Sequence, residues 1–192
     1  MSQDLTFARL FQIGTRFWEA KVLLSAIELG VFTELTKGPL DLQTLTTRLE
    51  IHPRGARDFF DALVSLHLLE RHDGKYTNVP DTDFFLDKNK PTYAASFLEM
   101  ANVRLYPFWG SLTEGLRTGQ PQNESKDGNT DLFDALYKDP TGLRLFVQGM
   151  TGHSKGGIVQ ALAQKFPWHK YKTFLDVGTA VLYLWLRVGF LR

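Results

Sequence analysis

The sequence contains no cysteine, so disulfide bonds, thiol catalysis and cysteine-ligated metal sites are excluded. An excess of charge of one sign is also missing, because 22 basic and 21 acidic residues give a formal net charge of +1. No overall field therefore draws the protein to nucleic acid or to an anionic membrane. The five histidines show no ligand spacing with one another or with carboxylates, so we expect no metal site.

Long hydrophobic runs are absent as well. The longest, Val181 to Leu191, is interrupted by Arg187 and falls short of the roughly 20 residues of a membrane-spanning helix. The N-terminus carries Asp4 and no unbroken apolar core, unlike a signal peptide. We therefore expect a cytoplasmic protein without membrane association. What is abundant is core material, since 43% of the 192 residues are hydrophobic and 13% are aromatic.

The first eighty residues alternate helical patterns with turn signals. Apolar residues in 17–35 follow one helix face, and Gly30 interrupts the pattern. Asp41 can cap a second helix, and Pro53 can begin a third that covers 53–70. Asp73-Gly74 then separates two short extended runs, which is a strong hairpin signal. Three helices followed by a hairpin predict a winged helix.

A winged helix can bind DNA or join two protein chains. Between Thr36 and Pro80 the sequence carries six basic and six acidic residues, so no basic surface faces phosphates. The third helix is also apolar over most of its length, "FFDALVSLHLL". A helix with that much apolar surface favours burial on a partner, so we favour dimerisation over DNA binding.

The middle of the chain is helical in pattern over 83–118 and again from 132 to 166, with a polar, linker-like stretch at 119–131 between them. Aromatic and methionine side chains are dense here. They fit a hydrophobic core, or an apolar pocket for an aromatic small molecule with a few polar groups. The candidate pocket residues are Phe97, Met100, Asn102, Tyr106, Trp109, Phe146 and Met150.

The last part of the chain contains one extended apolar run, Thr173 to Gly178. A strand that ends in Asp-x-Gly, here Asp176 to Gly178, is how a dinucleotide-type fold begins its glycine-rich turn, although a single glycine is a weak signal. Upstream, His153 lies between two predicted helices, where it can face a ligand or remain a solvated loop residue.

The order of these segments resembles the N-terminal half of class I S-adenosylmethionine-dependent O-methyltransferases of the hydroxyindole, plant phenolic and bacterial polyketide type. The segments that carry the resemblance, over residues 10 to 180, are "AIELGVFTEL", "LVSLHLLERHDGKYTNVP", "FWGSLTEGLRTGQP", "GMTGHS" and "FLDVG". It implies a homodimer interlocked through the winged helix, and a small aromatic substrate that faces the seven pocket residues. It also implies S-adenosylmethionine bound near His153, Asp176 and Gly178, with a histidine general base further along the family's sequence.

The sequence departs from the family pattern after Ala180. The last glycine position of the family's turn is Leu182 here, and "VLYLWLRVGFLR" does not resemble the family's continuation. Sixteen residues after Asp176 are too few for a β-α-β unit of roughly 30 residues. We therefore expect a truncated chain that is inactive alone and binds the cofactor weakly or not at all. We predict no catalytic residue in it.

These observations predict a mainly α fold with four segments: a winged-helix dimerisation domain at 1–82, a helical substrate-pocket region at 83–170, the start of a Rossmann-like domain at 171–180 and a non-matching apolar tail at 181–192. The predicted function is the dimerisation and substrate-binding part of an O-methyltransferase for small phenolic metabolites. A DNA-binding regulator and a purely structural dimerisation module remain the alternatives.

Overall fold

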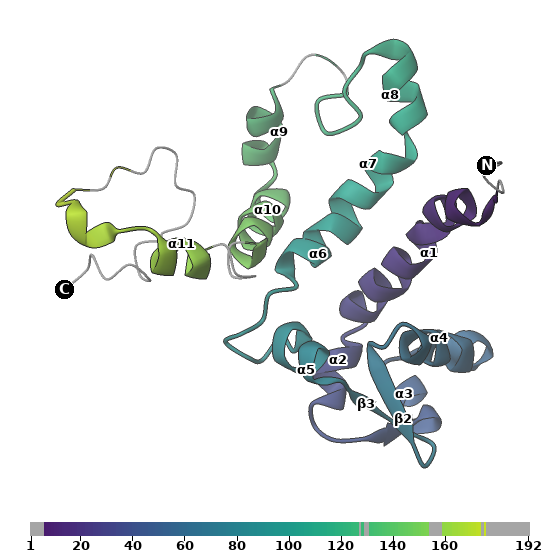
Figure 1. Ribbon diagram of the computed structural model, residues 1–192. Helices are drawn as coiled ribbons and strands as arrows, with labels where there is room; N and C mark the ends of the chain where they lie inside the picture. The colour runs from purple at the N-terminus through teal and green to yellow at the C-terminus, as the bar shows by residue number, and fades with distance from the viewer. Residues whose placement is uncertain (1–5, 127, 129–130, 154–158, 174, 176–192) are drawn as a thin grey trace, which may run out of the picture. The chain divides into compact units, whose positions relative to one another are not determined.

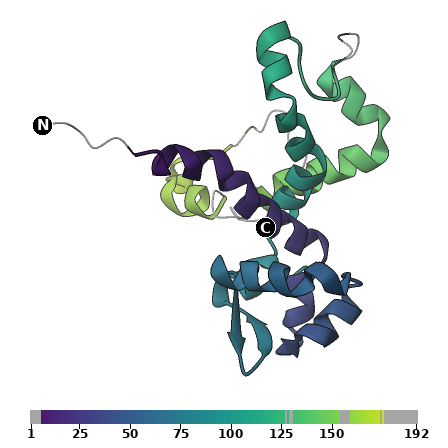
Figure 2. The same ribbon diagram turned by 90° about the vertical axis from the view of Figure 1, so that its right-hand side faces the viewer.

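The computed structural model describes residues 6–126, 128, 131–153, 159–173 and 175. Of residues 153, 159 and 160 it describes the helical backbone alone. The chain divides into two compact units, Met1–Lys90 and Pro91–Arg192. Both units are built mainly from helices, and the described strands form one small sheet in the first unit (Figures 1 and 2). The predicted mainly α fold class is confirmed.

The first unit contains the helices and the following hairpin that the sequence predicts. Its elements are α1 (Ala8–Glu28), α2 (Val31–Leu35), β1 (Leu40–Asp41), α3 (Leu42–Arg48), α4 (Pro53–Ser65), β2 (Leu69–His72), β3 (Lys75–Asn78) and α5 (Pro80–Leu86). Helix α5 contacts α2 and β3, and the first compact unit includes it.

Local signals set where these helices begin and end. Gly30 separates α1 from α2 with a left-handed φ of 75°, a conformation that glycine adopts without steric cost. The Asp41 carboxylate accepts a hydrogen bond from the Thr44 backbone N–H at 2.8 Å and so caps α3 as predicted. Pro53 occupies the first turn of α4, where its missing N–H costs nothing.

The sheet is antiparallel, with strand order β1-β3-β2. Two residues, Asp73 and Gly74, join β2 to β3, and both have positive φ, 49° and 78°. Positive φ at both central residues is the mark of a type I′ turn, which matches the twist of the paired strands. The hairpin projects from the helices of this unit (Figures 1 and 2). The hairpin prediction is confirmed.

The third helix is shorter than predicted. We expected it to cover 53–70, but α4 ends at Ser65 and Leu69 begins β2. His67, with a φ of 55°, reverses the chain there, and its N–H bonds to the Val64 carbonyl while the Leu68 N–H bonds to the Leu63 carbonyl. This pair of bonds is a Schellman motif, which ends a helix regardless of the apolar residues that follow.

The core of the first unit lies between the helices and the sheet. Its largest fully buried side chains are Tyr76, Phe32, Phe60, Ile27, Leu45, Leu63, Leu69 and Val31. Phe60 of α4 lies against Tyr76 of β3, with ring centroids 5.2 Å apart. The Tyr76 hydroxyl donates to Asp61 Oδ1 at 2.7 Å, and burial together with that carboxylate raises the pKa of Tyr76 to about 12.

The second unit is helical throughout its described secondary structure. Its elements are α6 (Ser96–Met100), the π-helical segment η1 (Ala101–Leu105), α7 (Tyr106–Gly110), α8 (Leu112–Thr118), α9 (Leu132–Lys138), α10 (Pro140–His153), α11 (Val159–Lys165) and the 3₁₀ turn η3 (Trp168–Lys170). Segments α6, η1 and α7 follow one another without a break and form a single long helical rod (Figure 1). Among the described helices of the chain, none has the length and apolar character that crossing a membrane requires.

Candidate functional site

Helices α6 and α10 pack closely because glycines of α10 face α6. A methyl group added at Gly149 would lie 2.8 Å from Met100 Sδ, and one added at Gly152 would lie 2.1 Å from Ser96 Oγ. The Gly152 methyl would also meet backbone, with the Ala94 carbonyl oxygen at 3.1 Å. The two helices can therefore pack this closely only because positions 149 and 152 have no side chain.

Six of the seven predicted pocket residues lie on the two helical segments that meet where α6 packs on α10, which we call the α6–α10 crossing. Phe97, Met100, Asn102 and Tyr106 lie along α6, η1 and α7, while Phe146 and Met150 lie on α10. Met100 and Asn102 are buried, and Phe97, Tyr106 and Phe146 are half-buried. Arg104 of η1 stacks over the Phe146 ring at 5.5 Å, which links the two helices. A substrate role for these residues stays a prediction.

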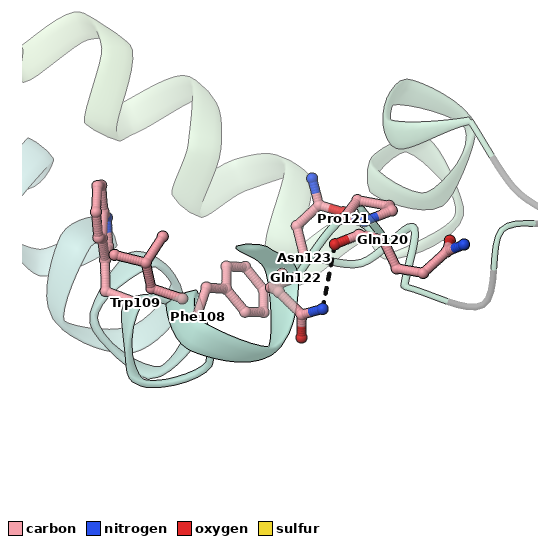
Figure 3. Close-up of a pocket in the computed structure, with 8 residues that line it drawn as sticks. Phe108, Trp109, Gln120, Pro121, Gln122 and Asn123 are labelled. Atoms are coloured by element: carbon pink, nitrogen blue, oxygen red, sulfur yellow. Dashed lines mark hydrogen bonds between the residues drawn. The ribbon is translucent and has the colours of Figure 1, made fainter. Parts of the chain in front are cut away.

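Trp109, the seventh predicted residue, lines a different cavity with none of the other six (Figure 3). This cavity has a volume of about 330 Å³. It lies between α7, α8 and the turn that follows α8, and its lining residues are Phe108, Trp109, Leu112, Gly115, Gln120, Pro121, Gln122 and Asn123. Seven of these eight were not among the predicted pocket residues, and four of them, 120–123, fall in the stretch predicted as a linker.

Residues 119–126, part of the stretch 119–131 predicted as a linker, are fastened to the helices on two sides. Arg104 of η1 makes a two-pronged ion pair with Glu124, with Nη2 and Oε2 3.1 Å apart, and Lys126 pairs with Glu114 of α8 at 2.9 Å. Burial acts to raise the pKa of Glu124, but the hydrogen bond from Arg104 outweighs it, and the pKa is lowered. The ion pairs hold this segment against α8 and shape one wall of the cavity.

Two buried polar atoms of the fastened turn, Gln122 Oε1 and Ser125 Oγ, have no hydrogen-bond partner among the described residues. They have almost no accessible surface, so neither faces an open cavity. Burial and the Glu99 carboxylate raise the pKa of Tyr93, so its hydroxyl keeps its proton.

The predicted cofactor residues cannot be placed. His153 is the last residue of α10, but its side chain lies outside the described residues, as do Asp176 and Gly178. Of the predicted strand at 173–178 only Thr173 and Leu175 are described, neither of them in a strand, and the apolar tail lies outside the described residues. Within the described part of the chain, no group of three or more histidine, aspartate or glutamate side chains could hold a metal ion.

Comparison with protein families matches residues 11–88 to the O-methyltransferase dimerisation domain. This range covers most of the first unit, from within α1 to the residues after α5.

Individual relatives cover nearly the whole chain. It is 42% identical over 172 residues to the tetracenomycin polyketide synthesis 8-O-methyl transferase TcmO of Streptomyces glaucescens, covering 89% of this chain and 49% of the relative. It is 32% identical to the N,N-dimethyltransferase OxyT of Streptomyces rimosus, with the same coverage. The chain therefore spans about half the length of the curated relatives it matches.

Among solved structures, human N-acetylserotonin methyltransferase in complex with S-adenosylmethionine superposes with a TM-score of 0.75. The match is 28% identical and covers 87% of this chain and 50% of that one. The described fold is thus shared with one half of a methyl-transferring protein.

Proposed function

The chain belongs to the S-adenosylmethionine-dependent O-methyltransferase family through its dimerisation domain at residues 11–88, and from this premise we propose that it supplies the dimerisation and substrate-binding part of such an enzyme. The first unit is proposed to be a winged helix that joins two copies of the chain. The second unit is proposed to hold a small aromatic molecule whose hydroxyl accepts the methyl group.

The observation that carries the dimer proposal is the exposed apolar surface of α1. Its C-terminal end is buried in the core of the first unit through Leu24, Ala26 and Ile27. The other end and the residue before it leave six large apolar side chains 52% to 70% exposed: Phe7, Leu10, Phe11, Ile13, Phe17 and Trp18.

These six side chains share one broad face. At 3.6 residues per turn they fall within an arc of about 160°, and Arg9, Gln12 and Arg16 lie on the opposite side of the helix. A helix face that is this apolar favours burial against a partner. A second copy that contributes the same helix encloses both, as a two-fold symmetric dimer does.

The dimer is tested by placing a charge on α1. We expect Phe11→Glu to convert a dimer at tens of micromolar into a monomer, as measured by analytical ultracentrifugation, because the carboxylate would be buried without a partner. Phe133→Glu on α9 is the matched control, since Phe133 is 55% exposed and Phe11 53%. A wild-type chain that sediments as a monomer at this concentration contradicts the proposal.

The substrate proposal is supported by the α6–α10 crossing and by the relatives. TcmO is named for an O-methyl transfer in polyketide synthesis, and its 42% identity exceeds the 32% of the N,N-dimethyltransferase OxyT. This difference favours a hydroxyl over an amine as the methyl acceptor. The proposed contacts are Phe97, Met100, Asn102, Tyr106, Phe146 and Met150, with Trp109 in the neighbouring cavity.

For the methyl donor, we propose that His153, Asp176 and Gly178 face S-adenosylmethionine in the assembled site. The 192-residue chain alone should bind it no more tightly than high micromolar, because Leu182 stands where the family's turn has its last glycine. Calorimetric titration measures this affinity. Low-micromolar binding accompanied by methylation of a phenol would contradict the expectation.

A role on nucleic acid is not proposed, because the segment 36–80 carries six charges of each sign. We expect no salt-dependent retention of the chain on duplex DNA.

A further inference from the structure

We propose that Arg104 is a positioning residue of the α6–α10 crossing: it fixes the ring of Phe146, and the Glu124 carboxylate in turn holds Arg104 in place. The inference rests on the proposed function, because Phe146 is one of the residues proposed to contact the methyl acceptor. It adds two residues that act through Phe146 rather than on the acceptor itself.

Arg104 and Phe146 come from different helical segments. Arg104 lies in η1, which continues α6, and Phe146 lies on α10, which packs against α6 (Figure 1). The Arg104 Cζ atom is 5.5 Å from the centroid of the Phe146 ring. A guanidinium at this distance is attracted to a ring face, and its planar shape lets it stack there. One face of the Phe146 ring is thus covered by a cation from the facing segment.

Glu124 gives this cation a fixed orientation. Arg104 Nε donates to Glu124 Oε1, and Nη2 donates to Oε2 at 3.1 Å. Such a two-pronged pair sets the plane of the guanidinium as well as its position. The Arg104 side chain is only 12% exposed, so loss of the carboxylate would leave a nearly buried cation without this partner.

A ring that is held before binding favours an aromatic guest. Phe146 is half-buried, so burial alone leaves part of its side chain open to solvent and to rotation. A guest that stacks on a rotating ring must order it, whereas a ring already held by Arg104 needs no ordering. The expected effect of the positioning is therefore a gain in affinity, with no new contact to the guest.

The same ion pair also fastens residues 119–126 to the rod, and the two roles have to be separated. Lys126 and Glu114 form a second pair, with Nζ and Oε1 2.9 Å apart, that fastens this turn to α8. Their side chains are 49% and 50% exposed. Lys126→Met therefore loosens the turn from its other side and is the matched control for Arg104→Met.

Fluorine NMR of para-fluorophenylalanine at position 146 reports on the ring without any ligand. We expect Arg104→Met, which keeps an apolar stem and removes the cation, to shift and broaden the signal. Lys126→Met should leave the signal in place. An unchanged signal in Arg104→Met would overturn the positioning of the ring.

Equilibrium dialysis of the 192-residue chain against 2-naphthol, used as an aromatic probe, measures the consequence for binding. We expect Arg104→Met to weaken binding about two- to tenfold, the effect of having to order one side chain. Lys126→Met should bind as the wild type does. Equal weakening in the two variants would mean that both ion pairs only hold the turn, and would overturn the proposal.

Glu124→Gln tests whether Glu124 acts through Arg104. The amide keeps the shape of the side chain and removes its charge. We expect weaker 2-naphthol binding in the wild-type background but no further weakening in Arg104→Met, because the residue through which Glu124 acts is then gone. Additive losses in the double variant would overturn the role assigned to Glu124.

The two readouts separate this inference from the proposed function. A wild-type chain that binds no 2-naphthol would contradict the proposed function, and with it a substrate role for Phe146. Binding of 2-naphthol together with a fluorine signal insensitive to Arg104 would overturn the inference alone. Circular dichroism shows whether each variant is folded. Should Arg104→Met unfold, Arg104→Lys takes its place and should give a smaller change in the same direction, because lysine keeps the charge without the planar fork.

Discussion

At the scale of single residues, the clearest unit is the group around Tyr76. Its buried ring packs on Phe60, its hydroxyl bonds to Asp61, and Arg71 both pairs with Asp61 at 3.3 Å and lies over the Tyr76 ring at 5.4 Å. This group ties α4 to the hairpin. Nothing in the sequence spacing announces it, because Asp61 and Tyr76 are 15 residues apart and meet only in the folded unit.

Replacing the hydroxyl tests the contribution of this group. We expect Tyr76→Phe to lower the free energy of unfolding by about 1–2 kcal/mol, because a hydrogen bond to a carboxylate is lost while the ring packing stays. Urea denaturation followed by circular dichroism measures this loss. Tyr137→Phe serves as the control, since the Tyr137 side chain is 66% exposed and should change the value by less than about 0.5 kcal/mol.

At the scale of elements, the helix starts and the turn that depend on only one or two residues could be predicted from the sequence. Asp41, Pro53 and the Asp73-Gly74 turn each have a local stereochemical preference that survives without the rest of the fold. The end of α4 was mispredicted because its Schellman motif has His67 at the left-handed position, where glycine is the usual signal.

Helix α3 ends in the same manner. Glu50 has a φ of 55°, and the Ile51 N–H bonds to the Thr46 carbonyl. The pocket wall at 120–123 was missed for a related reason. Its position depends on ion pairs between Arg104 and Glu124 and between Glu114 and Lys126, and pairs so far apart in sequence leave no periodic trace.

The α6–α10 crossing gives a prediction at the same scale. Gly152→Ala should destabilise the second unit by about 1–3 kcal/mol, because the added methyl meets the Ala94 carbonyl oxygen and the Phe97 backbone nitrogen, both at 3.1 Å. Thermal unfolding followed by circular dichroism reports the change. Gly110→Ala, with open space around its Cβ, should be neutral or slightly stabilising, and an equal loss in both variants would contradict this explanation.

At the scale of the whole molecule, the proposed dimer would make stability a property of two chains together. We expect the midpoint of thermal unfolding to rise by on the order of a few °C for each tenfold increase in protein concentration, because association stabilises only the folded state. Differential scanning calorimetry over a hundredfold concentration range measures this. A midpoint independent of concentration, both in the wild type and in Phe11→Glu, would contradict it.

The close approach at Gly149 and Gly152 also decides how this region can be re-engineered. Any side chain at these two positions would push α10 away from α6, so both glycines belong to the fixed frame of a mutant library. Phe146 and Met150 lie on the same helix without that constraint, since they are half-buried and 39% exposed respectively. Randomising positions 146 and 150 while keeping 149 and 152 constant would alter the surface proposed for the aromatic substrate and leave the spacing of the two helices intact.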